Sequence, residues 1–161
     1  MDINNLSGKR VLVFGSGISG EAASRLLLAK GASVVLYDGN DKLDAKKIRR
    51  EIVAECSGDA PLQIVLGAFP EEILEEIALT VMSPGVPTDL PVVEKMRQKG
   101  IPVWGEVELA YAAGKGDVLA ITGTNGKTTT TSLLGEIMRN AADHVFVVGN
   151  IGTPYSAIAP E

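Results

Sequence analysis

Residues 11–38, VLVFGSGISGEAASRLLLAKGASVVLYD, decide how this sequence folds. The apolar run at 11–14 ends in glycine, and the spacing of apolar residues after it predicts a helix that stops at Gly31. A second apolar run at 33–37 ends at Asp38. The stretch therefore predicts a strand–helix–strand unit.

The same alternation continues along the rest of the 161 residues. It predicts strands at 62–66, 79–82, 101–104, 118–121 and 145–148, and helices at 44–55, 71–77, 90–99, 106–113 and from the second glycine cluster to residue 140, with no helix after 145–148. This order is typical of an α/β protein with a Rossmann-like parallel sheet covered by helices. Gly114, Lys115 and Gly116 interrupt the pattern, so we expect a first domain at 1–113 and the beginning of a P-loop ATPase α/β domain at 114–161.

The composition limits the kinds of partner. The net charge is −5 without a basic stripe, which argues against non-specific binding of nucleic acid. No apolar run approaches the roughly 18–20 residues of a membrane span, and the N-terminus lacks the pattern of a signal peptide. Cys56 is the single cysteine, so no disulfide forms within the chain. These features predict a cytoplasmic protein without membrane insertion.

The first glycine cluster, GSGISG at residues 15–20, matches G-x-G-x-x-G between a strand and a helix. Glycine lets the backbone approach a pyrophosphate, and the helix N-terminus supplies unpaired N–H groups. Asp38, 18 residues after Gly20, is placed to accept a hydrogen bond from a sugar hydroxyl or a base N–H. The motif predicts a nucleotide site without naming the nucleotide. NAD or FAD is the obvious interpretation, and a tight turn that binds nothing is the alternative.

The second glycine cluster, GTNGKT at residues 123–128, resembles a P-loop. Its backbone N–H groups would wrap phosphates, Lys127 would bridge the β- and γ-phosphates, and the Thr128 hydroxyl would reach Mg²⁺. Ile121 stands where the usual G-x-x-x-x-G-K-[ST] motif has its first glycine. The threonine run from Thr128 to Thr131 starts a helix poorly, a conflict typical of functional sites. The alternative is a glycine turn capped by threonines beside a solvated lysine.

The two clusters together resemble a known family. GTNGKT is the P-loop form of the Mur ligases and of their relatives, the folylpolyglutamate synthetases. Three further segments resemble the D-glutamate-adding branch of the Mur ligases and occur in its order: VLVFGSGISGEAA at 11–23, SPGVP at 83–87 and GNIG at 149–152. The chain is thus similar to the N-terminal portion of such a ligase.

The resemblance implies that the first domain binds a UDP-sugar rather than NAD. By position, the residues bordering this substrate would be Ser16, Gly17, Ile18, Ser19, Asp38, Gly39, Asn40, Ser83, Pro84, Gly85 and Asn150. The residues binding ATP would be Gly123, Thr124, Asn125, Gly126, Lys127, Thr128 and Thr129. Among these, Lys127 would be the catalytic residue and Thr128 the ligand of Mg²⁺.

The resemblance also implies the reaction, which is ATP-dependent ligation of D-glutamate to UDP-N-acetylmuramoyl-L-alanine in peptidoglycan synthesis. ATP would phosphorylate the alanine carboxylate, and the D-glutamate amine would then displace phosphate from the acyl phosphate. Members of the family are longer, so another acidic Mg²⁺ ligand, a histidine, a modified lysine and a third domain are expected beyond Glu161. We therefore expect this chain alone not to catalyse ligation.

Several alternatives stay open at the level of sequence. A sister ligase for another amino acid shares the chemistry, and the pocket that would distinguish it lies outside this chain. An NAD(P)-binding oxidoreductase or redox-sensing module accounts for GSGISG and Asp38 but leaves the P-loop unexplained. A non-catalytic nucleotide-binding regulator is a further class. Residues 114–161 could pack on the first domain, pair with another copy, or be mobile.

Overall fold

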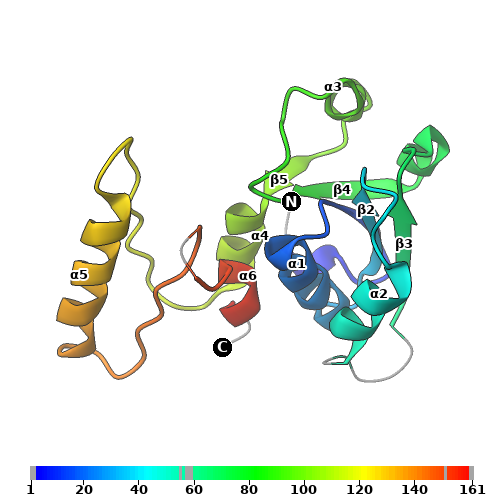
Figure 1. The fold of residues 1–161 in the computed structure, drawn as a ribbon. Coiled ribbons are helices and arrows are strands. Elements are labelled where there is room, and N and C mark those ends of the chain that lie inside the picture. Colours follow the sequence, from blue (N-terminus) through cyan, green and yellow to red (C-terminus); the bar gives the residue numbers. More distant parts are fainter. Residues whose placement is uncertain (1–2, 55, 57–59, 151, 160–161) are drawn as a thin grey trace.

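A parallel five-stranded sheet organises the first part of the chain (Figure 1). The computed structural model describes residues 3–54, 56, 60–150 and 152–159. The strands are β1 (Arg10–Phe14), β2 (Ser33–Asp38), β3 (Leu62–Leu66), β4 (Ile77–Met82) and β5 (Val103–Gly105). They lie in the order β3-β2-β1-β4-β5, and every neighbouring pair is parallel. This is the order of a Rossmann-like sheet, so the predicted α/β class is confirmed.

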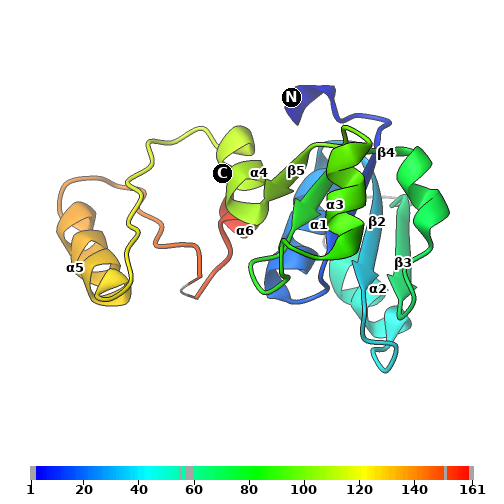
Figure 2. The same cartoon turned by 90° about the horizontal axis from the view of Figure 1, so that it is seen from above.

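Helices cover both faces of this sheet (Figure 2). The helical elements are η1 (Ile3–Asn5), α1 (Ile18–Ala29), α2 (Ala45–Val53), η2 (Glu71–Glu75), α3 (Pro91–Gln98), α4 (Glu106–Ala113), α5 (Lys127–Arg139) and α6 (Tyr155–Ile158). One face carries α1, α2 and α4, whereas η2 and α3 cover the other. Asp44 caps α2 by accepting hydrogen bonds from the N–H groups of Lys46 and Lys47, so the predicted helix begins at Ala45.

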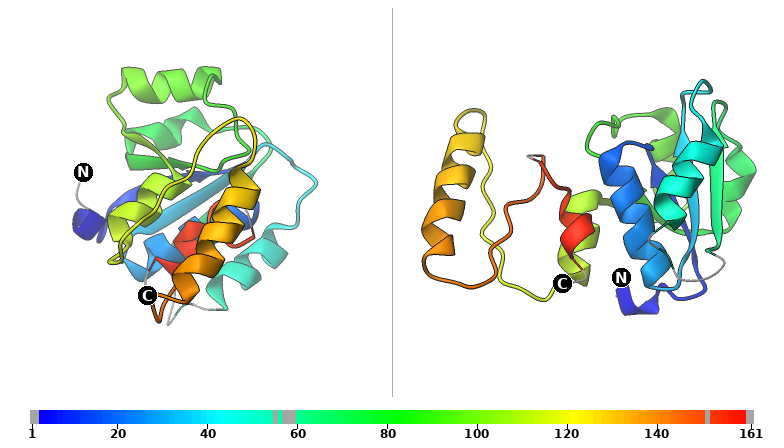
Figure 3. Two further views of the ribbon diagram at one scale, coloured as in Figure 1. Left: turned by 90° about the vertical axis from the view of Figure 1, so that its left-hand side faces the viewer. Right: turned by 60° about the horizontal axis from the view of Figure 1, so that its bottom comes forward.

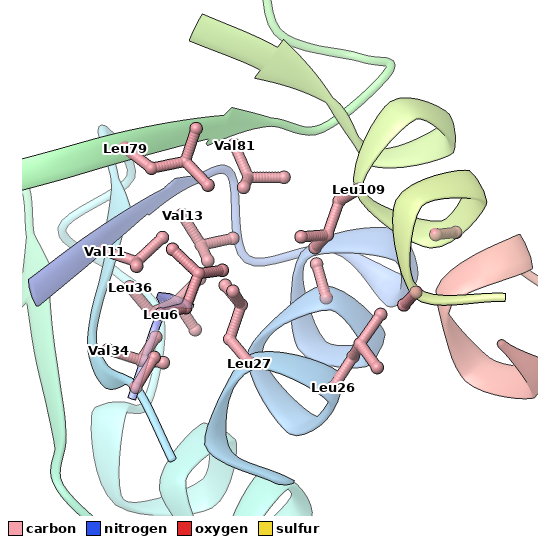
Figure 4. Packing of buried hydrophobic residues seen from close by; sticks show 14 of the residues in the cluster. Leu6, Val11, Val13, Leu26, Leu27, Val34, Leu36, Leu79, Val81 and Leu109 are labelled. Carbon is pink, nitrogen blue, oxygen red and sulfur yellow. The ribbon is translucent and has the colours of Figure 1, made fainter. Parts of the chain in front are cut away.

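The central strand β1 is buried on both sides. Val11 and Val13 join the cluster under α1 and α4, whereas Leu12 and Phe14 join the cluster on the opposite face. This alternation follows from the two-residue period of a strand. Figure 4 shows Leu27 of α1 directed toward the first cluster. A strand buried on both faces needs a continuous apolar run, which is why VLVF has no polar residue.

Some predicted elements of the first domain have different bounds. The predicted helix at 71–77 is a 3₁₀ helix that ends at Glu75, because Ile77 pairs with Arg10 as the first residue of β4. The strand predicted at 101–104 begins only at Val103. Glu55 of the helix predicted at 44–55, Ile151 of the GNIG segment and the outermost residues of both predicted domains lie outside the described residues.

The two strands predicted at 118–121 and 145–148 are wrong. Isolated extended segments leave their backbone groups without a ladder, and residues 118–121 pair with no strand among the described residues. Leu119 is accordingly 62% exposed. Val148 forms only an isolated bridge with Thr153. Helix α5 stands apart from the sheet in Figures 1 and 3, joined to the first domain by extended segments.

The chain returns to the first domain after α5. Helix α6, which contradicts the expectation of no further helix, packs against α1 and α4. Tyr155 lies against the core cluster of that face, and Ala159 is 2% exposed. Of the three arrangements left open by the sequence, packing on the first domain is therefore confirmed for this last segment. No helix among the described residues is both long and apolar enough to cross a membrane.

Candidate functional site

The loops after β1 and β4 meet at the carboxyl edge of the sheet. These strands are neighbours, and the helices that follow them, α1 and α3, cover opposite faces. The two connections therefore diverge at this point, which is the kind of topological switch point where open parallel sheets bind ligands. GSGISG lies after β1, and Ser83, Pro84 and Gly85 lie after β4.

The first and third glycines of GSGISG shape the loop itself. Gly15 has φ +99°, a conformation that side chains disfavour, and its N–H donates to the Tyr37 carbonyl oxygen at 2.7 Å. A Cβ on Gly20 would lie 1.8 Å from the Gly15 carbonyl oxygen, so only glycine fits where α1 presses on the loop. A Cβ on Gly17 would meet no atom within 4 Å. The middle glycine therefore faces open space, as a ligand-binding position requires.

The N-terminus of α1 is directed at this loop. Gly17 is its N-cap, and no side chain caps the helix end. The first N–H groups of a helix have no intrahelical acceptor and carry a partial positive charge. Ile18, the first residue of α1, is 73% exposed. The geometry suits an anionic group such as a diphosphate, with an apolar side chain beside it.

Asp38 holds the glycine-rich loop. One oxygen, Oδ2, accepts hydrogen bonds from the Ser16 N–H at 2.9 Å and the Ser16 hydroxyl at 2.7 Å. The other, Oδ1, accepts from the Asn40 N–H at 3.0 Å. Burial raises the pKa of the Asp38 carboxyl, but these hydrogen bonds to the charged form outweigh it and bring the pKa below its ordinary value. The structure thus brings Ser16, Asp38 and Asn40 together.

Ser83 joins the loop after β4 to the loop after β1. Its hydroxyl donates to the Gly15 carbonyl oxygen at 3.1 Å, and its N–H donates to the Phe14 carbonyl oxygen at 3.0 Å. Ser83 is buried, whereas Pro84 and Gly85 are exposed beside it. The predicted residues of both loops therefore lie next to one another at the carboxyl edge of the sheet.

Asn150 lies on a separate loop. The Gly149 N–H donates to the Thr153 carbonyl oxygen at 3.0 Å and closes this loop at its base. Gly149 and Gly152 have φ +117° and +71°. Pro154 alone separates Thr153 from α6, so the loop continues directly into the helix that packs on α1.

The P-loop opens α5. Gly123 and Gly126 have φ +146° and +78°, and Gly126 is the N-cap of the helix. The Lys127 ammonium donates to the carbonyl oxygens of Gly123 and Thr124, the second at 3.1 Å. The segment stands apart from the sheet domain in Figures 1 and 3, so the structure does not bring the residues predicted to bind ATP to the loops after β1 and β4.

The residues of this loop fit a polyphosphate. A helix N-terminus without a side-chain cap, two glycines with positive φ and one exposed cation provide donors for phosphate oxygens. The part of the chain that the structure describes holds no group of three His, Cys, Asp or Glu residues that could bind a metal. Thr128, the residue predicted to hold a magnesium ion, is the second residue of α5.

Sequence reasoning missed a buried polar pair. Glu106 is 3% exposed and accepts hydrogen bonds from Ser156, which is 2% exposed. The two residues are 50 positions apart, so no local pattern points to their contact. An acidic residue in the first turn of a helix is ordinarily solvated. The burial of Glu106 becomes visible only in the folded structure, where α6 packs against α4.

A separate cavity of about 370 Å³ lies between η2 and α3. Four of its charged lining residues form ion pairs, Lys95 with Glu71 and Lys99 with Glu75. It shares no residue with the loops after β1 and β4. We assign it no ligand.

Comparisons with known proteins find two family matches along the chain. Residues 9–105 match the family described as Mur ligase MurD-like, N-terminal domain, and residues 121–159 match the Mur ligase middle domain. The UDP-N-acetylmuramoylalanine–D-glutamate ligase of Lachnospira eligens is 51% identical over 156 residues, which are 97% of this chain and 33% of that protein. The enzyme of that name from Caldanaerobacter subterraneus is 48% identical over 155 residues, 95% of this chain and 33% of its own length.

A solved structure shares the fold. The pseudomurein peptide ligase type C from Methanothermus fervidus matches with a TM-score of 0.57 at 22% identity, over 95% of this chain and 31% of its own. The chain spans about a third of the length of these relatives. On the family matches and the identity to the curated relatives, the chain belongs to the Mur ligase family.

Proposed function

We propose that this chain is the front part of an ATP-dependent ligase that adds D-glutamate to UDP-N-acetylmuramoyl-L-alanine. The observation that carries the proposal is the junction of the loops after β1 and β4, which the Ser83–Gly15 hydrogen bond joins, together with a P-loop-like segment in the same chain. The 51% identity to a relative of that name supports the choice of substrate. A cytoplasmic location fits a nucleotide-activated substrate.

In the proposed complex the diphosphate of the UDP-sugar lies against GSGISG and the N-terminus of α1. Backbone N–H groups and the helix dipole stabilise the negative charge without a cationic side chain. Ile18 packs against the nucleoside, and Ser16, Gly17 and Ser19 border it. Pro84, Gly85 and Asn150 lie toward the sugar, and Gly39 and Asn40 toward the uracil.

The state of Asp38 favours UDP over NAD. An NAD-binding Rossmann site uses an acidic residue at the end of β2 to accept hydrogen bonds from the ribose hydroxyls. Here three protein donors already occupy the two Asp38 oxygens, out of about four acceptor positions on a carboxylate. Little capacity remains for two further hydroxyls, which weighs against the oxidoreductase alternative.

The P-loop segment would supply the phosphoryl donor site. The ligand set proposed for ATP is Gly123, Thr124, Asn125, Gly126, Lys127, Thr128 and Thr129. Lys127 exchanges its carbonyl partners for phosphate oxygens and neutralises charge on the phosphoryl group in transit. Thr128 would hold Mg²⁺, which when bound would supply further charge neutralisation.

The proposed reaction balances in two steps. A carboxylate oxygen of the alanine residue forms a bond to the γ-phosphorus while the bond from that phosphorus to ADP breaks. The D-glutamate amine then attacks the carbonyl carbon, loses a proton and expels phosphate. We propose the boundary of the two domains at 113/114.

Calorimetric titration of the chain tests the proposal. UDP-N-acetylmuramoyl-L-alanine should bind, and NADH should not. The Gly17→Ala variant provides the matched control, because the added Cβ meets no protein atom within 4 Å and yet occupies the ligand side of the loop. Binding of NADH without binding of the UDP-sugar would overturn the proposal.

A further inference from the structure

Glu106 is the one charged residue with a buried side chain among the described residues, at 3% exposed. It is the first residue of α4 and follows β5 directly at the carboxyl edge of the sheet. Burying a carboxylate is costly unless hydrogen-bond donors replace the lost water. The position therefore requires dedicated partners.

Ser156 supplies both donors that the structure gives Glu106. The Ser156 N–H donates to Oε1 at 2.7 Å and the Ser156 hydroxyl donates to the same oxygen at 2.5 Å. Ser156 is the second residue of α6, so its N–H has no acceptor within that helix. The carboxylate thus satisfies a donor that α6 itself leaves unpaired.

Helix α6 depends on this contact. Its four residues are far fewer than a helix needs to form by itself, so its place is set by packing on α1 and α4. Gly114 leaves room for its first side chain, since a Cβ there would lie 2.9 Å from the Tyr155 hydroxyl oxygen. Glu106 is the polar part of this packing.

The contact also crosses the boundary between the two family matches. Residues 9–105 match the N-terminal family and Glu106 follows them directly, whereas Ser156 lies within the middle-domain match. The Asn150 loop ends one residue before α6, and α1 carries the glycine-rich loop at its own N-terminus. Glu106 belongs to α4 and binds α6, which also packs on α1, so its carboxylate helps hold the Asn150 loop in place relative to the glycine-rich loop.

We propose that Glu106 is a positioning residue for the sugar end of the UDP-substrate. Its carboxylate fastens α6 through Ser156 and so holds Asn150 in a fixed place relative to GSGISG. The inference rests on the proposed function, because it takes both loops to border the same ligand. Glu106 acts in this proposal without touching the substrate, and the proposed role explains why its side chain is buried.

The experiment compares two ligands on variants of the chain. UDP-N-acetylmuramoyl-L-alanine and UDP are titrated into the wild type, Glu106→Ala, Glu106→Gln, Ser156→Ala and, as the matched control on the exposed side of α4, Glu108→Gln. Glu106→Ala should weaken binding of the UDP-sugar about tenfold, the loss expected when one charge-assisted contact is removed, and change binding of UDP less than about twofold. Glu106→Gln keeps an acceptor oxygen and should lose only about threefold.

Two further readouts separate positioning from a purely structural role. In a double-mutant cycle, Glu106→Ala should add little to the loss caused by Asn150→Ala, because the first acts through the second. Amide hydrogen exchange should show a protected Ser156 N–H in the wild type and in Glu108→Gln, and a fast-exchanging one in Glu106→Ala. If Glu106→Ala does not fold, Glu106→Gln and Ser156→Ala carry the same comparison.

The outcomes distinguish this inference from the proposed function. A wild type that binds no UDP-sugar overturns the proposed function, and this inference with it. If the wild type binds the UDP-sugar and Glu106→Ala binds it with equal affinity, this inference alone is overturned. Glu106 would have only a structural role if Glu106→Ala lost equal affinity for UDP and for the UDP-sugar, or if its loss of affinity added to that of Asn150→Ala. Either result would also overturn this inference.

Discussion

The Ser83 hydroxyl donates a hydrogen bond to the Gly15 carbonyl oxygen at 3.1 Å, across 68 positions of the sequence. Gly15 in turn leaves no room for a side chain on Gly20, whose Cβ would lie 1.8 Å from that same oxygen. One carbonyl oxygen therefore fixes the loop after β1, the start of α1 and the loop after β4. These are the three segments that border the proposed diphosphate site.

Replacing Ser83 by alanine should loosen this junction. The variant leaves the buried Gly15 carbonyl oxygen without its side-chain donor, which costs about 0.5–1.5 kcal/mol of the free energy of unfolding. Binding of the UDP-sugar should weaken in the same variant, because the two loops no longer share a fixed spacing. Urea unfolding and calorimetry measure the two effects. Thr88→Ala, at an exposed position of the same loop, is the control, and equal behaviour of the two variants would contradict the prediction.

The second and third glycines of GSGISG should respond differently to alanine. Gly20→Ala forces a Cβ into the Gly15 carbonyl oxygen at the packed start of α1, so we expect a loss of several kcal/mol of stability or no folded protein. Gly17→Ala should leave the stability within about 1 kcal/mol and still impair UDP-sugar binding. Thermal unfolding and calorimetry on both variants decide the matter. A stable Gly20→Ala protein would refute the packing argument.

The strand–helix–strand unit was predictable because its signals are local. An apolar run, a glycine turn and helical spacing up to Gly31 follow one another without interruption, and the structure forms β1, α1 and β2 there. The parallel sheet follows from the repetition of such units. The roles of the individual site residues remain predictions, since sequence and fold place them without showing a ligand.

The rest was not predictable because it depends on distant partners. Residues 118–121 have the composition of a strand, yet a strand forms only where a neighbouring ladder accepts its backbone groups. Helix α6 is too short to show a period, and the Glu106–Ser156 contact joins residues 50 positions apart. The hydrogen bonds of Asp38 were also not predictable. The motif predicted that Asp38 lies beside the glycine-rich loop, but only the structure shows that its carboxylate accepts hydrogen bonds from Ser16 of that loop.

Asp38 should make stability depend on pH in the acid range. Its folded pKa lies below the ordinary value of 3.8: although burial raises it, the hydrogen bonds from Ser16 and Asn40 lower it further. A depressed folded pKa contributes stability that is complete above the unfolded pKa and is lost as pH falls through the folded pKa. The difference in free energy of unfolding between wild type and Asp38→Asn should therefore be constant near neutral pH and shrink below about pH 4. Urea unfolding across this range measures it, with Asp89→Asn at an exposed loop position as the control for removing one charge.

Lys127 should be essential for binding of ATP and should not affect binding of the UDP-sugar. Its side chain is exposed, and its ammonium group donates hydrogen bonds to carbonyl oxygens of its own loop, so Lys127→Ala should fold as the wild type does. The ammonium group would make charge-assisted hydrogen bonds to phosphate worth about 1.5–3 kcal/mol each, so ATP affinity of the proposed full-length ligase should fall at least about tenfold. UDP-sugar binding should stay unchanged, since α5 stands apart from the sheet that carries the loops after β1 and β4 (Figure 1). Titration with ATP and Mg²⁺, beside the exposed control Lys115→Ala, tests both halves. Unchanged ATP affinity in Lys127→Ala would remove the P-loop assignment, and a parallel loss of UDP-sugar binding would show that the two sites are coupled.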